Sequence, residues 1–154
     1  MTQRLNLYTV APKALEPLMA LEGVIKASSL EPSLIELVKI RGSQMNGCAN
    51  CLHMHTADAR AAGELEERIY LLDAWRESAM YTPRERAALA WTESLTKVAE
   101  THAPDADYEG LKPHFADEEI VYLTVLITAI NAWNRIAIGF RAEHPNDRKL
   151  KAAA

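Results

Sequence analysis

Apolar residues recur along this chain at the three- and four-residue spacing of amphipathic helices, whereas alternation at a spacing of two is scarce. One helix is predicted to begin after Pro12. A second leads up to Gly47, with Leu34, Leu37 and Val38 at helical spacing. Gly47 suits the C-terminal end of this second helix, because glycine tolerates the left-handed backbone found there.

The remaining apolar spacing and the helix start and stop residues predict more helices and no significant sheet. Helices are expected over about 48–63 and 64–78. Another over 82–102 has a strong start signal: a threonine cap, a proline at the first helical position, and a glutamate three residues after the cap. We therefore expect one all-α domain over residues 1–154, with antiparallel helices around the segment that begins near residue 48.

The last predicted helix, closed by Pro145, is apolar almost all round over residues 120–140. A membrane span is one interpretation of such a stretch. Asn131, Asn134 and Arg135 interrupt it, which favours a buried central helix or a subunit contact over a membrane partner.

Charge and composition limit the classes of binding partner and the cellular compartment that we expect. The formal net charge is −4, which argues against nucleic acid because phosphate binding needs clustered Lys and Arg. Polar residues and two prolines interrupt the N-terminal stretch before an apolar signal core forms, so we expect a reducing cytoplasm. In that compartment a cysteine pair is typical of catalysis or metal binding rather than of a permanent crosslink.

The chain has two cysteines, Cys48 and Cys51, and His55 follows the second by one helical turn. On a helix all three lie on one face. A thiolate is the reactive form of cysteine, whose free pKa is about 8.5, so a neighbouring histidine or a helix N-terminus would activate it. A dithiol of this kind can cycle through a disulfide.

Glu36 on the preceding helix could orient His55 if the two helices pack antiparallel across the turn at Gly47. Other interpretations stay open. Glu36 could instead pair with Lys39 or Arg41. The cysteines could be inert core residues, and together with His55 and Glu36 they could supply four zinc ligands. No second Cys or His pair supports a zinc site, so we expect no metal and no cofactor.

The stretch "ELVKIRGSQMNGCANCLHMH" resembles the core signature of the AhpD-like alkylhydroperoxidases, within the carboxymuconolactone decarboxylase superfamily. The matching positions are Glu36, Cys48, Cys51 and His55, with the family's spacing, and the resemblance is most specific over about residues 36–63. It implies an all-α, AhpD-like fold and a homo-oligomer, commonly a trimer or hexamer.

The resemblance further implies a thiol peroxidase that reduces small hydroperoxides. Cys51 would be the peroxidatic cysteine, Cys48 the resolving cysteine, and His55 with Glu36 the proton relay. A lipoylated or thioredoxin-like protein would then supply the dithiol that restores the pair.

Asn50 departs from the family pattern, which has a histidine immediately before the second cysteine in its best-known peroxidases. Asparagine forms hydrogen bonds but carries no proton at neutral pH. His53, two residues from Cys51 and from His55, is not expected to share their face. Two alternative functions therefore stay open: a carboxymuconolactone-decarboxylase-like enzyme, and a non-catalytic oligomeric thiol redox sensor.

Overall fold

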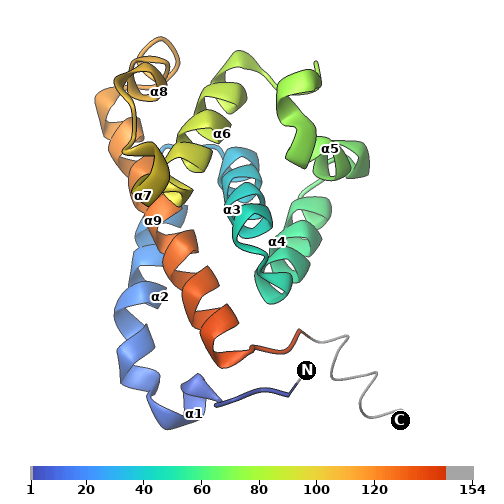
Figure 1. Cartoon of the computed structure of the whole chain (residues 1–154), viewed down its shortest axis with the longest axis vertical. Helices are drawn as coiled ribbons and strands as arrows, with labels where there is room; N and C mark the ends of the chain where they lie inside the picture. The colour runs from blue at the N-terminus through green and yellow to red at the C-terminus, as the bar shows by residue number, and fades with distance from the viewer. Residues whose placement is uncertain (1, 145–154) are drawn as a thin grey trace.

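The computed structural model describes residues 2–144 and contains helices but no strand in that range, which confirms the all-α prediction (Figure 1). The helices are α1 (Leu7–Val10), α2 (Pro12–Lys26), α3 (Pro32–Asn46), α4 (Ala49–Ala61), α5 (Glu66–Leu71), the 3₁₀ helix η1 (Leu72–Glu77), α6 (Pro83–Thr96), α7 (Val98–Thr101), α8 (Asp105–Glu109) and α9 (Asp117–Phe140).

Helix α3 lies at the centre of the fold and packs against α4, α6 and α9 (Figure 1). Its side chains at Leu37, Val38 and Ile40 are fully buried and belong to two core clusters, one toward α9 and one toward α5 and η1. Burial of apolar surface on both sides fixes the position of α3. The less buried face of α3, which carries Glu36, is thereby fixed in position.

Helix α9 is long and apolar enough to span a membrane, yet half of its most apolar 18-residue stretch is buried inside this fold. That burial agrees with the expectation of a central helix. The helix ends earlier than the sequence pattern suggested: it stops at Phe140, and Arg141 adopts a left-handed conformation with φ of 54°. The predicted terminator, Pro145, lies outside the described residues.

Two predicted helices are broken in the structure. The helix expected over 64–78 divides into α5 and η1, with Ala74 in a non-helical conformation. The helix expected over 82–102 begins with the predicted capping box at Thr82 and Glu85, but Lys97 separates α6 from α7. Local residue preferences located the starts of these helices, whereas tertiary packing decides the breaks.

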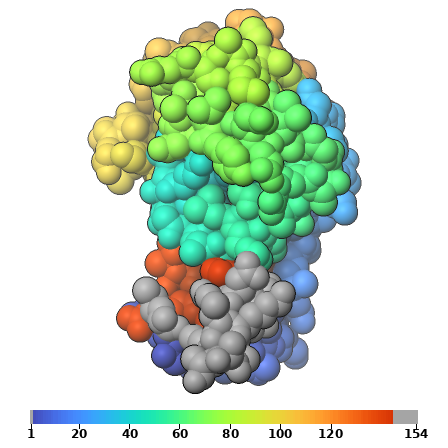
Figure 2. Space-filling view, turned by 90° about the vertical axis from the view of Figure 1, so that its right-hand side faces the viewer, coloured from blue at the N-terminus to red at the C-terminus, as the bar shows by residue number. Residues whose placement is uncertain are grey.

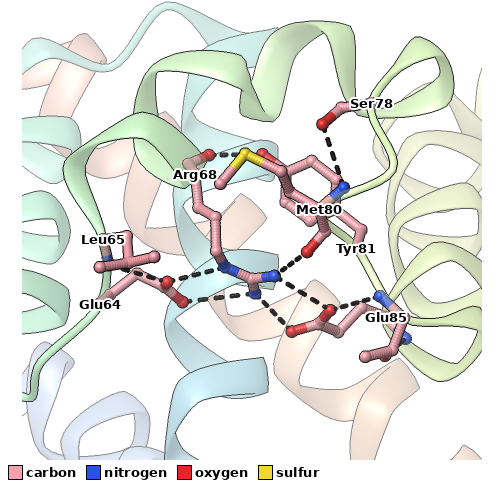
Figure 3. Close-up of polar contacts among 8 residues, drawn as sticks. Glu64, Leu65, Arg68, Ser78, Met80, Tyr81 and Glu85 are labelled. Atoms are coloured by element: carbon pink, nitrogen blue, oxygen red, sulfur yellow. Dashed lines mark hydrogen bonds and ion pairs between the residues drawn. The ribbon is translucent and has the colours of Figure 1, made fainter.

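An ion cluster ties α5 to the start of α6. Figure 3 shows the Arg68 guanidinium between the carboxylates of Glu64 and Glu85, at 2.8 and 2.5 Å. Arg68 also donates to the Met80 carbonyl, and the Tyr81 hydroxyl donates to the Arg68 carbonyl. These contacts hold the segment between α5 and α6 in place.

Candidate active site

The turn between α3 and α4 places the cysteines. Gly47 adopts a left-handed conformation (φ 69°, ψ 34°), which suits a residue without a side chain. The Cys48 amide then donates to the Ser43 carbonyl at 3.0 Å, which closes the end of α3. Cys48 becomes the N-cap of α4, and its sulfur accepts a hydrogen bond from the Cys51 amide.

Cys48 and Cys51 are joined as a disulfide, with their Cα atoms 5.4 Å apart. They are 1% and 2% exposed and pack against Ile130 of α9. Both lie at the N-terminus of α4, where the helix dipole favours a thiolate after reduction. In Figure 2 the teal surface of α3 and α4 lies above the orange-red end of α9.

His55 and Glu36 are in contact, as the sequence allows if α3 and α4 pack antiparallel. The Nδ1 atom of His55 lies 2.9 Å from Oε2 of Glu36, and the side chains are 8% and 20% exposed. Residues at comparable distances from the Gly47 turn are thus in contact, as the antiparallel packing of α3 and α4 requires. With Nδ1 held by the carboxylate, Nε2 is the ring nitrogen left for proton transfer.

The competing partners of Glu36 are engaged elsewhere. Lys39 forms an ion pair with Glu22 at 2.6 Å, and Arg41 binds Glu93 at 2.8 Å. The interpretation of Glu36 as the partner of a neighbouring cation on its own helix is therefore wrong for this structure. The carboxylate is instead committed to the histidine.

A cavity of about 880 Å³ opens beside this pair. Cys51, His55 and Glu36 line it, whereas Cys48 is not among its lining residues. Other parts of its wall come from the N-terminal segment, α2 and α9: Gln3, Asn6, Leu7, Tyr8, Met19, Trp133 and Ile136. Cavities of this size hold small organic molecules. The arrangement gives one of the two cysteines direct access to a ligand space.

Asn50 and His53 also line the cavity, at its edge on α4. His53 stacks on His144, with ring centroids 4.9 Å apart, and His144 is partly buried. The contact joins residues far apart in the sequence, so helical spacing could not have revealed it.

Asn131 and Asn134 connect helices rather than line the cavity. The Asn46 amide donates to the side-chain oxygens of both residues at 2.9 Å. Asn131 in turn donates to Thr96, and Asn134 donates to Ser43. These asparagines thus form hydrogen bonds between helices, which brace the end of α3 that leads into the cysteine turn.

A metal ion could be held by a different set than the one considered from sequence. Glu36, His55 and Asp58 each offer a ligand atom, and these atoms lie within 4.8 Å of one another. The two sulfurs are bonded to each other and do not join this set. Because a cation here would occupy the Glu36–His55 pair, it would compete with proton transfer.

The fold and this site together define a helical domain with a redox-capable C-x-x-C and a carboxylate-oriented histidine. The model of the carboxymuconolactone decarboxylase family matches residues 12–94, and the chain belongs to that family.

Relatives extend the likeness over nearly the whole chain. The uncharacterized protein YdfG of Bacillus subtilis is 46% identical over 90% of this chain and 94% of its own length. The crystal structure of ATU0492 from Agrobacterium tumefaciens, a protein of unknown function provisionally described as an antioxidant defence protein AhpD, superposes with a TM-score of 0.91. It is 50% identical and covers 94% of this chain and 99% of its own. The fold is thus AhpD-like.

The AhpD core of an uncharacterized peroxidase-related protein from Ralstonia eutropha JMP134 superposes with a TM-score of 0.80 at 21% identity. The match covers 91% of this chain and 75% of that one. At this identity the likeness concerns the fold alone.

Proposed function

We propose that this protein is a thiol-dependent peroxidase that reduces hydroperoxides through the Cys48–Cys51 dithiol, with His55 and Glu36 as its proton relay. The observation that carries the proposal is the 2.9 Å contact between His55 and Glu36, beside a cavity that Cys51 also lines. Family membership and the likeness to AhpD-type proteins support a role in antioxidant or peroxidase-related chemistry.

In the first step His55 takes the proton of the Cys51 thiol, and Glu36 stabilises the resulting imidazolium. The thiolate attacks the outer peroxide oxygen and the O–O bond breaks. The leaving alkoxide takes the proton back from His55 as an alcohol, and Cys51 becomes a sulfenic acid. One turn of helix separates the two side chains, so they share the face that this exchange requires.

In the second step the Cys48 thiol attacks the Cys51 sulfenic acid. An S–S bond forms, the S–O bond breaks, and the hydroxyl leaves as water with the thiol proton. A dithiol reductant then restores both thiols by exchange and is itself oxidised to a disulfide. This reductant is a lipoylated or thioredoxin-like protein, and the working form is a cytoplasmic homo-oligomer, a trimer or hexamer.

The test is hydroperoxide consumption with a dithiol reductant in excess. Wild type should turn over, whereas Cys51→Ser should lose activity to the background level. Arg60→Ala, an exposed substitution on the same helix, serves as the matched control and should retain wild-type activity. Equal peroxide consumption by wild type and Cys51→Ser would overturn the proposal.

The family match also supports a second candidate, a cofactor-free enzyme that acts on a carboxymuconolactone. Such an enzyme has no need of a dithiol. Turnover of the lactone by a Cys48→Ser, Cys51→Ser double variant would favour it.

A third candidate is the oligomeric redox sensor, which is supported by Asn50 in place of the family histidine. It predicts reversible oxidation of the dithiol without turnover of hydroperoxide.

A further inference from the structure

One wall of the cavity is built by an N-terminal segment that has no buried side chain. Gln3, Asn6, Leu7 and Tyr8 line the cavity together with Cys51. Residues 2–6 are exposed and α1 contains no buried residue, so Leu15 is the first buried side chain in the described chain. Segments with little buried apolar surface open locally at low free-energy cost.

Hydrogen bonds to the end of α9 hold this segment in place. The Arg4 amide donates to the Phe140 carbonyl at 3.0 Å, and the Arg4 guanidinium donates to the Gly139 carbonyl at 2.9 Å. The Gln3 amide donates to the Glu143 carboxylate at 3.3 Å. Figure 1 shows the N-terminal segment running beneath the C-terminal end of α9.

These contacts can fasten the N-terminal segment to α9, and we call them the latch. The last carbonyls of a helix lack partners within the helix, and a cation near them interacts favourably with the helix dipole. Arg4 supplies both a donor and a charge to the end of α9. The bonds of the Gln3 amide and the Arg4 guanidinium are exposed, however, so water can replace them and each adds little to stability.

The wall that α4 contributes differs in this respect. It carries Cys51 and His55, whose buried side chains contact Ile130 of α9 and Glu36 of α3, respectively. The N-terminal wall can therefore move without opening the core, whereas the α4 wall cannot.

We infer that residues 2–10, latched by Arg4 to the end of α9, form a releasable wall that decides the size of molecule able to reach Cys51. Small molecules enter the cavity with the wall closed. A bulky molecule needs the latch to open. This inference takes Cys51 as the reacting thiol of the proposed function, but access to that thiol can be measured without any peroxidase activity.

The experiment compares two reagents with the same reactive group, N-methylmaleimide and fluorescein maleimide. The protein is the full chain carrying Cys48→Ser, so that Cys51 is the one thiol available. Labelling rates are followed by mass spectrometry in this background and after addition of Arg4→Ala. Arg60→Ala, another exposed arginine, is the matched control.

We expect Arg4→Ala to raise the fluorescein maleimide rate about three- to tenfold, the change that loss of one such hydrogen bond produces. The N-methylmaleimide rate should stay within about twofold, and Arg60→Ala should change neither rate. Deletion of residues 2–5 should give a larger change of the same kind. Because none of the deleted residues is buried, the thermal midpoint should stay close to that of the parent.

Equal labelling ratios in all variants would overturn the inference, as would equal acceleration of both reagents by Arg4→Ala. A protein that shows the selective change but consumes no hydroperoxide would retain the releasable wall and lose the proposed function. The two failures are therefore distinguishable.

Discussion

Two largely buried carboxylates of this protein, Glu36 and Glu93, have contrasting surroundings. Glu93 is 15% exposed and accepts from Arg41, from Arg76 and from the indole of Trp75. Glu36 is 20% exposed, bonds to His55, and lines the cavity. Burial alone therefore does not mark a functional acid. The difference lies in what surrounds each carboxylate: Glu93 is saturated by donors, whereas Glu36 orients a group that can exchange protons with a ligand.

Substitutions of the two residues should therefore have different effects. Substitution of Glu93 should lower the stability of the fold, because Glu93 links α3, η1 and α6. Substitution of Glu36 should lower catalytic activity and leave the fold intact.

The largest expected effect on stability is that of Glu93→Gln. The substitution removes the carboxylate that binds Arg41 and Arg76 in a partly buried cluster, and of these two arginines only Arg41 keeps a second ion-pair partner, Asp73. We expect a loss of about 2–3 kcal/mol in the free energy of unfolding, measured by urea denaturation. A loss below about 0.5 kcal/mol would show that the cluster is not structural.

Glu36→Gln should give the converse result. The glutamine preserves the shape of the side chain but cannot stabilise an imidazolium, so we expect hydroperoxide turnover to fall at least about tenfold. The free energy of unfolding should change by less than about 1 kcal/mol. Steady-state kinetics and urea denaturation on the same preparation check both halves. Full activity would remove Glu36 from the relay.

The smallest effect is a pH dependence of stability. Burial by itself would raise the pKa of Glu93, but hydrogen bonds from Trp75 and Arg76 and the charge of Arg41 lower it below its usual value of 4.5 overall. A carboxylate with a lowered pKa stabilises the fold above its unfolded pKa, and this stabilisation is lost as the pH falls through the folded value.

The difference in stability between wild type and Glu93→Gln should therefore be greatest near neutral pH and should shrink below about pH 4.5. Urea denaturation at pH 7 and pH 3.5 measures it. A difference that stays constant between these two conditions would contradict the assignment of Glu93 as an ionised carboxylate.

Local sequence signals predicted the parts of the fold that local chemistry decides. Gly47 ends α3 in the left-handed conformation that its lack of a side chain permits, and Thr82 caps α6 as its motif indicated. The meeting of Glu36 and His55 was also predictable, because it depends only on two helices and the turn between them. These features all arise within short stretches of chain.

Contacts between distant segments could not be predicted in the same way. The bonds from Asn46 to α9, and the wall that Leu7 and Tyr8 add to the cavity, join positions far apart in the sequence. Helix α1 has no buried residue and so leaves no apolar periodicity to detect. The break at Ala74 arises within a stretch whose apolar spacing is helical. Tertiary packing decides all of these features.

Activation of Cys51 by His55 can be measured through the pH dependence of Cys51 alkylation in the Cys48→Ser background. With His55 present, we predict that the alkylation rate rises with a midpoint well below about pH 8.5, the value for a free cysteine. Addition of His55→Ala should move that midpoint upward. A midpoint near 8.5 in both proteins would contradict the account and would assign the dithiol a structural or sensing role.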